Sequence, residues 1–230
     1  MRSIVIIPAL NEETNIPLLL EKIPFSDTLD VLVVDDHSCD RTVSVVEKVS
    51  ALFSRVKVVT SPWAEHGLAY CYKAGFEHAL KNGYEAVIGM DADGSHDPLE
   101  IPRLLLGLEN ADWVVGSRYV SGGNAQGLGL ARYLISRLAN FYIGKKLRTQ
   151  IRDMTSGFNC FKVDVLKRVD FLHIGSKGFV FQAEMKYLAL KAGFVFKEMP
   201  IRFHHRYAGR SKFSLGIVFE AFARLHGLKG

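Results

Sequence analysis

Short apolar runs alternate with segments of helical period along the first half of the chain. Such runs, bounded by turn-forming residues, are typical of strands buried on both faces of a parallel sheet. The expected strands comprise residues 3–10, 30–36, 55–61, 85–91 and 112–120. The helices expected between them comprise residues 13–23, 41–50, 68–82 and 99–108. Repeated βα units of this spacing predict an α/β fold with a mostly parallel, doubly wound sheet flanked by helices.

The pattern changes near residue 127. The remaining expected elements are a long helix at 127–147, short strands near 157–163 and 195–203, a helix near 181–191 and a final amphipathic helix at about 215–228. No internal repeat, low-complexity tract or linker divides the chain, so we expect residues 1–230 to form a single domain. The change of pattern separates a first half, about 1–125, from a second half, about 126–230, which should pack on the first.

The composition is that of an ordinary globular protein, with 230 residues, 48% hydrophobic and 23% charged. The net charge of +5 favours anionic partners such as phosphates, nucleic acid or an acidic membrane surface. Cys39, Cys71 and Cys160 are odd in number and form no CxxC pair, which indicates reduced thiols and no zinc site. The first strand-like run leaves no room for a signal peptide, and no apolar run approaches the roughly 18 residues of a membrane span. We therefore expect a soluble or peripheral protein in a cytosolic setting.

Acidic side chains follow the apolar run that ends near Met90. Asp91 and Asp93 are expected at the carboxyl end of this strand, the edge at which open α/β sheets bind ligands, and residues two apart in an extended chain point the same way. Two like charges repel unless a cation lies between them, so a divalent ion completed by a nucleotide diphosphate would stabilise the pair. The alternative is that aspartates here only cap a loop and the next helix, as Asp97 before Pro98 suggests.

The first two strands also end in carboxylates. Glu12 follows the first strand and Asp35 and Asp36 follow the second, so all three should project to the same edge, where they suit the hydroxyls of a ribose or the donors of a base. The first turn, "PALNEETN", lacks the glycines that let a backbone wrap a pyrophosphate. A diphosphate would therefore need a metal and cationic side chains, which argues against a dehydrogenase.

Several motifs together resemble one enzyme family. They are "PALNEE", "VVDDHSCDRT", "MDADGSHDP", "VVGSRYVSGG", "MTSGFNCF", "FVFQAEM" and "HHRYAGRSKFS". In this order they resemble the inverting glycosyltransferases of family 2 with a GT-A fold, especially the dolichol-phosphate mannose synthases and related polyprenyl-phosphate glycosyltransferases. The resemblance covers nearly the whole chain. It implies a first half that binds a nucleotide-sugar and a second half on the acceptor side.

The resemblance also implies roles for individual residues. The nucleotide-sugar site would comprise Pro8, Leu10, Glu12, Val34, Asp36, Asp91, Ala92, Asp93, Arg206 and Lys212. The metal, Mg²⁺ or Mn²⁺, would be held by Asp91, Asp93 and Ser95, and the acceptor phosphate by Arg118, Arg132 and Ser136. The catalytic residues would be Asp93, Arg118, Arg206 and Lys212. Two positions depart from the family: Ser95 stands where some members place a glutamine, and Leu10 where an aromatic residue often stacks on the base.

The chemistry supports a phosphate acceptor. Inverting transfer to a hydroxyl normally needs a carboxylate base, whereas a lipid phosphate is already an oxyanion because its second pKa is about 6. The remaining task is to hold two phosphates and stabilise the charge on the leaving diphosphate, which suits a metal and cations. The cations available are Arg118, Arg132, Arg206, Arg210 and Lys212. A hydroxyl acceptor would need a base, for which Asp153 is the best candidate, and at most one of His204 and His205 should contact the site.

Two amphipathic segments suggest how the chain meets a lipid substrate. Residues 130–148 interleave apolar residues with basic ones, and residues 213–230 carry apolar residues with few charges. Such helices either lie at a membrane surface or pack on a core. We expect GDP-mannose as donor, a polyprenyl phosphate as acceptor, and peripheral contact or an anchoring partner at the cytoplasmic face of the membrane. The alternatives are glucosyl or N-acetylglucosaminyl transfer from a UDP-sugar, and a nucleotide-binding module without turnover. Nucleic acid is disfavoured because the strand-end acids would repel its phosphates.

Overall fold

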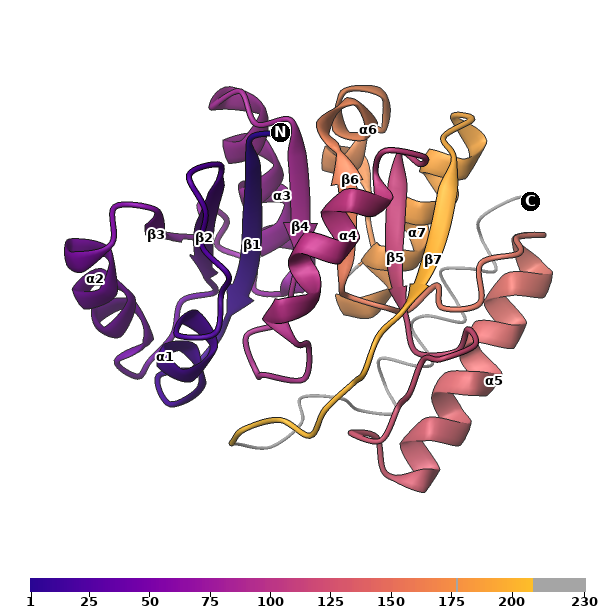
Figure 1. The fold of residues 1–230 in the computed structure, drawn as a ribbon, viewed down its shortest axis with the longest axis horizontal. Helices are drawn as coiled ribbons and strands as arrows, with labels where there is room; N and C mark the ends of the chain where they lie inside the picture. The colour runs from indigo at the N-terminus through magenta and orange to yellow at the C-terminus, as the bar shows by residue number, and fades with distance from the viewer. Residues whose placement is uncertain (177, 209–230) are drawn as a thin grey trace.

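A computed structural model describes residues 1–176 and 178–208 and shows one seven-stranded sheet at the centre of the fold (Figure 1). The strand order is β3-β2-β1-β4-β6-β5-β7. The strands are β1 (Ser3–Ala9), β2 (Leu29–Asp35), β3 (Val56–Thr60), β4 (Ala86–Gly89), β5 (Trp113–Ser117), β6 (Asn159–Lys162) and β7 (Phe196–Pro200). All neighbours pair in parallel except β6, which is antiparallel to both β4 and β5. The predicted α/β fold with a mostly parallel sheet is confirmed.

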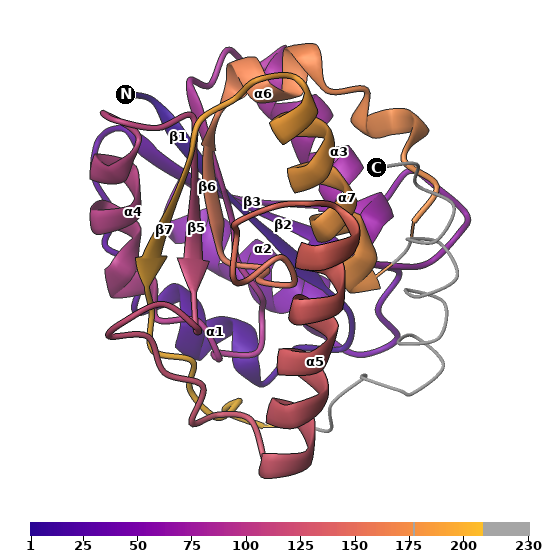
Figure 2. The same ribbon diagram turned by 90° about the vertical axis from the view of Figure 1, so that its right-hand side faces the viewer.

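Helices cover both faces of the sheet. They are α1 (Asn15–Leu20), α2 (Thr42–Leu52), α3 (Leu68–Lys81), α4 (Ile101–Gly107), α5 (Leu130–Lys146), α6 (Val163–Arg168) and α7 (Gly178–Lys191), with short 3₁₀ turns η1 (Pro98–Glu100) and η2 (Phe171–His173). Helices α1, α2 and α4 pack on one face, while α3, α6 and α7 pack on the other, as the two sides of the sheet in Figure 2 illustrate for α4 and α7.

The apolar strand runs are continuous because alternate residues enter two separate cores. In β1, Ile4 and Ile6 pack towards α3, whereas Val5 and Ile7 pack towards α1 and α2. All four side chains are at most 1% exposed. Burial on both faces removes the polar positions that an antiparallel, half-solvated strand would show, which explains why the runs could be read as parallel strands.

Some predicted boundaries were wrong. The expected strand at 112–120 ends at Ser117 because the backbone N–H of Arg118 donates to the Asp153 carboxylate and so leaves the ladder. The expected helix at 127–147 begins only at Leu130, since the N–H of Gly127 donates to the carbonyl of Phe203. The expected strand at 195–203 ends at Pro200, and α6 was not predicted at all. The helix expected at about 215–228 lies outside the described residues.

The antiparallel strand β6 has a consequence for the site. Parallel strands β1, β2, β4, β5 and β7 end at one edge of the sheet, and β6 begins at that edge, with Asn159 opposite Gly89. The segment that leads into β6, residues 153–158, therefore reaches the same edge as the loops that follow the parallel strands. Helix α5 extends past this edge (Figures 1 and 2). Within the described part of the chain, no helix has the length and apolarity needed to cross a membrane.

Candidate functional site

The loop after β4 carries Asp91 and Asp93, two of the predicted metal ligands. Strand β4 ends at Gly89, and Asp91 and Asp93 follow its carboxyl end as predicted, although they lie in a loop with a turn rather than in extended chain. The N–H of Asp91 donates to Nδ1 of the buried His96 (3.1 Å), and the N–H of Ser95 donates to Oδ1 of Asp93 (2.9 Å). These bonds fold the loop so that both carboxylates remain neighbours. The N-cap predicted for Asp97 is confirmed, because its Oδ1 accepts from the N–H of Leu99 at 3.0 Å.

The two carboxylates perturb each other. Burial raises the pKa of Asp91, and the negative charge of Asp93 raises it further, although Arg118 and Arg206 act in the opposite direction. Burial acts on Asp93 as well, but interactions with Ser95 and the charge of Arg206 outweigh it and lower the pKa of Asp93. The Asp91 side chain keeps 22% of its surface exposed. An ionised pair at this position would therefore be stabilised by an added cation.

The residues present fit a divalent cation with hard oxygen ligands. Asp91 and Asp93 offer carboxylate oxygens, and the hydroxyl of Ser95 is buried beside them without a well-formed hydrogen bond among the described residues. Residues 1–176 and 178–208 contain no group of three or more His, Cys, Asp and Glu side chains placed to bind a metal on their own. The protein would thus supply part of the coordination, and a diphosphate would have to supply the rest.

Gly157 makes room for Asp91 and was not identified from the sequence as a site residue. A Cβ atom at this position would lie 3.1 Å from Oδ1 and 3.5 Å from Oδ2 of Asp91. The glycine belongs to the motif "MTSGFNCF" in the segment that leads into β6. Its contact with a residue 66 positions earlier depends on the antiparallel entry of β6, which nothing in the local pattern predicts.

The segment after β7 crosses over this loop. We call residues 202–208 the strap. The N–H of His204 donates to the carbonyl of Ser95 (2.9 Å), and the N–H of Tyr207 donates to the carbonyl of Asp93 (3.0 Å). The guanidinium of Arg206 pairs with Oδ2 of Asp93 at 2.5 Å. The structure therefore brings Arg206 to the predicted metal and diphosphate site, while Arg210 and Lys212 lie outside the described residues.

Arg118 is held by a buried carboxylate. Its Nε lies 2.8 Å from Oδ2 and its Nη2 2.7 Å from Oδ1 of Asp153, and its backbone N–H also donates to Oδ2. Asp153 is fully buried, and the Arg118 side chain is only 9% exposed. Burial alone would raise the pKa of Asp153, but the charge and hydrogen bonds of Arg118 outweigh burial and lower it. Asp153, the candidate general base, is thus a weak base with both oxygens occupied.

The other predicted acceptor residues lie on the first turns of α5. Burial lowers the pKa of Arg132, and the positive charges of Arg206 and Arg118 lower it further, which places three guanidinium groups in one region. Ser136 accepts a hydrogen bond at 2.7 Å from the hydroxyl of Tyr119, whose ring lies 5.1 Å from the Arg118 guanidinium carbon. The structure thus brings Arg118, Arg132 and Ser136 together beside the aspartate loop.

The predicted nucleotide residues gather at the carboxyl ends of β1 and β2. Pro8 and Val34 are cross-strand partners, and Val34 is fully buried in the core towards α3. Both carboxylate oxygens of Asp36 accept from the N–H of Gly67, at 3.1 and 2.9 Å. Glu12 accepts from the side-chain amide of Asn15 at 2.6 Å. Leu10 and Ala92 belong to the loops that follow β1 and β4 at the same edge.

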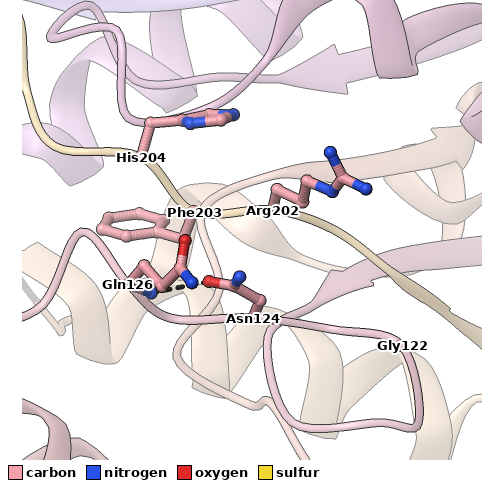
Figure 3. Close-up of a pocket in the computed structure, with 6 residues that line it drawn as sticks. All are labelled: Gly122, Asn124, Gln126, Arg202, Phe203 and His204. Atoms are coloured by element: carbon pink, nitrogen blue, oxygen red, sulfur yellow. Dashed lines mark hydrogen bonds between the residues drawn. The ribbon is translucent and has the colours of Figure 1, made fainter.

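A pocket of about 450 Å³ is lined in part by the strap (Figure 3). Its lining comprises Gly122, Asn124, Gln126, Arg202, Phe203 and His204. In Figure 3, Arg202 and His204 project to one side of the strap and Phe203 to the other. The Phe203 ring lies 5.4 Å from the Arg118 guanidinium carbon and 5.6 Å from the His96 ring. Of the two adjacent histidines, His204 is the one that lines this pocket.

A sheet edge with paired aspartates and converging guanidinium groups is suited to binding phosphates of a nucleotide. The chain belongs to glycosyl transferase family 2, whose family description matches residues 4–170. It is 36% identical over 233 residues to a polyprenol monophosphomannose synthase of Mycolicibacterium smegmatis, covering all of this chain and 88% of that protein. It is 39% identical over 225 residues to an undecaprenyl-phosphate mannosyltransferase of Micrococcus luteus, covering 96% of this chain and 91% of that protein.

Solved structures share the fold. A glucosyl-3-phosphoglycerate synthase from Mycobacterium tuberculosis, crystallised with Mn²⁺ and UDP-glucose, matches with a TM-score of 0.67 and 20% identity, over 98% of this chain and 77% of that one. The same enzyme with Mg²⁺ and UDP matches with a TM-score of 0.67 and 19% identity, over 97% and 79% of the two chains. The expected GT-A fold is therefore confirmed.

Proposed function

We propose that this glycosyltransferase transfers mannose, with inversion and with a divalent metal, from GDP-mannose to a polyprenyl phosphate. The names of the two mannosyltransferase relatives support the sugar and the acceptor. The observation that carries the proposal is the convergence of Arg118, Arg132 and Arg206 on the Asp91 and Asp93 loop. Two anionic phosphates must meet in this reaction, and a cluster of guanidinium groups offsets their repulsion.

On the donor side, Asp91 and Asp93 would hold Mg²⁺ or Mn²⁺, with Ser95 beside them. A solved relative by fold binds these ions together with UDP or UDP-glucose, which supports a metal in the same class of site. When bound, the ion would neutralise charge on the leaving diphosphate. Arg206 would act on the same charge from the strap, because its guanidinium already reaches Asp93.

On the acceptor side, the reaction would proceed without a protein base. A phosphate monoester is an oxyanion at neutral pH, with a second pKa of about 6, so it can attack the sugar directly. Arg118 would orient this phosphate through Nη1, which forms no hydrogen bond within residues 1–176 and 178–208, while its other nitrogens hold Asp153. Arg132 and Ser136 would complete the phosphate site. Attack on the face opposite the diphosphate would invert the anomeric centre.

Helix α5 would bring the site to a lipid surface. Apolar side chains of α5 are exposed at helical spacing: Leu130 (76%), Leu134 (51%), Leu138 (67%) and Phe141 (65%). Lys145 and Lys146 follow in its last turn, as anionic lipid headgroups would favour. We therefore place the protein at the cytoplasmic face of a membrane, in peripheral contact or held by an anchoring partner. Arg132 and Ser136, the proposed ligands of the acceptor phosphate on the same helix, would then lie near the lipid headgroups.

The test is a donor panel with one short polyprenyl phosphate. Purified protein is incubated with GDP-mannose, UDP-glucose or UDP-N-acetylglucosamine in Mg²⁺ or Mn²⁺, and the lipid product is identified by mass. We expect product from GDP-mannose, loss of product in chelator, and loss in Asp93→Asn with an unchanged melting temperature. A higher rate with one of the UDP-sugars would show that this sugar nucleotide, and not GDP-mannose, is the donor. If none of the three donors gave a lipid product, the result would contradict the proposal and favour a nucleotide-binding module without turnover.

A further inference from the structure

The strap is anchored on the far side of Arg206 as well. Its last described residue, Ala208, accepts a hydrogen bond at 3.3 Å from the side-chain amide of Asn15, the first residue of α1. The segment thus runs from the end of β7, over the aspartate loop, to α1 (Figure 1). Arg206 lies inside this segment. The distance between the strap and the aspartate loop therefore decides whether the Arg206 guanidinium can contact the loop.

Tyr207 sits directly on the turn of the aspartate loop. Gly94 adopts φ +78°, a conformation that favours glycine. A Cβ atom at Gly94 would lie 2.3 Å from Cε2 of Tyr207, so the ring occupies the space that any side chain would need. The backbone N–H of Tyr207 donates to the carbonyl of Asp93 in the same turn. Ring and backbone therefore fix the residue that follows Arg206.

Lys22 also contacts Tyr207. Its Nζ donates to the Tyr207 hydroxyl at 3.0 Å and lies 4.6 Å from the ring centroid, in reach of a cation–π interaction. The hydrogen bond to Tyr207 raises the pKa of Lys22, so the ammonium stays charged. Lys22 lies just after α1 and is exposed, and nothing in the proposed chemistry requires it. Its contacts with Tyr207 link the strap to the end of α1.

We propose that Tyr207 and Lys22 are positioning residues that form a latch, with the ring seated on Gly94. The latch holds the strap close enough to the aspartate loop for Arg206 to contact Asp93 and, on the proposed function, the donor diphosphate. A weaker latch leaves Arg206 and the reacting groups intact but lowers the fraction of protein with a closed strap. The donor KM should therefore rise while kcat changes little, since the bound donor draws the strap closed again.

The test combines amide exchange with kinetics in Lys22→Met, Tyr207→Phe and the double variant. In donor-free protein, peptides covering residues 204–208 should exchange about three- to fivefold faster in Lys22→Met, the scale of one exposed hydrogen bond with a cation–π contact. Tyr207→Phe, which keeps the ring, should show a smaller change. The double variant should equal Lys22→Met, because both changes remove the same contact. Lys48→Met, an exposed lysine on α2, is the matched control and should match wild type.

The outcomes separate the latch from the proposed function. If residues 204–208 exchanged faster in Lys22→Met but the wild type turned over no donor, the result would support the latch and contradict the proposed function. Turnover of GDP-mannose with unchanged exchange and donor KM in Lys22→Met would keep the function and overturn the latch. Additive effects in the double variant would also overturn it, since the two residues would then act independently.

Discussion

Asp153→Asn tests the role of the buried ion pair. The substitution keeps the shape of the side chain but leaves the Arg118 guanidinium, only 9% exposed, without its countercharge. Breaking a buried pair by removing one partner typically costs about 3 to 5 kcal/mol. For a chain of this size we expect the melting temperature to fall by roughly 6 to 20 °C. Asp164→Asn is the control, because its pair with Lys167 is exposed and should contribute less than about 1 kcal/mol.

The assay is urea unfolding of both variants across pH. The pKa of Asp153 is lowered in the folded protein, so the stabilisation that it provides is present above the ordinary carboxyl value of 3.8 and is lost as pH falls through the lowered pKa. The difference between wild type and Asp153→Asn should therefore be largest near neutral pH and shrink below pH 3.8. A variant within about 1 kcal/mol of wild type at pH 7 would refute the reasoning that this pair is buried and strongly coupled.

Three further predictions concern the site and its support. Gly157→Ala places a Cβ atom 3.1 Å from Oδ1 of Asp91, and turnover should fall roughly tenfold with little loss of stability; kcat equal to wild type would show that the carboxylate moves freely. Arg132→Ala should raise the acceptor KM by about tenfold and leave the donor KM nearly unchanged, while the reverse pattern in steady-state kinetics would move Arg132 to the donor site. Burial lowers the pKa of Lys186 to about 7, so the unfolding free energy should rise between pH 7 and the unfolded value of 10.5, by up to about 1.4 kcal/mol per unit. Urea unfolding of Lys186→Met should lack that rise, and an identical slope would show that Lys186 stays charged.

Much of the fold could be predicted from the chain because the signals are local. Apolar runs and helical periods mark the strands and most helices, and loops after parallel strands necessarily meet at one edge. The convergence of Asp91, Asp93 and Arg206 follows from this rule together with the family motifs. The ion pair between Arg118 and Asp153 does not follow from these signals. Arg118 was expected to serve an acceptor phosphate, and no pattern indicated that most of its hydrogen bonds go to Asp153, 35 residues later.

The remaining features depend on tertiary contacts without a periodic signal. Strand β6, with the sequence NCFK, carries no local signal of its direction, so the antiparallel pairing that brings Gly157 to Asp91 had to be observed. Lys186 lies on a helix among apolar residues and is fully buried, with its amine donating to the carbonyls of Met154 and Ser156 at 3.0 and 2.8 Å. A single lysine in such a pattern is ordinarily exposed. The division of the chain into nucleotide and acceptor halves stays a prediction.

The central claim is that the acceptor is a phosphate oxyanion and that no protein base is needed. The most direct test compares a polyprenyl phosphate with the free polyprenol of the same length, with GDP-mannose and metal, from pH 5 to 8. The account predicts transfer to the phosphate alone, with a rate that rises only through the second ionisation of the acceptor, at about 6, and then stays level, in wild type and in Asp153→Asn alike. Equal transfer to the alcohol, with the rise at low pH abolished in Asp153→Asn, would contradict it.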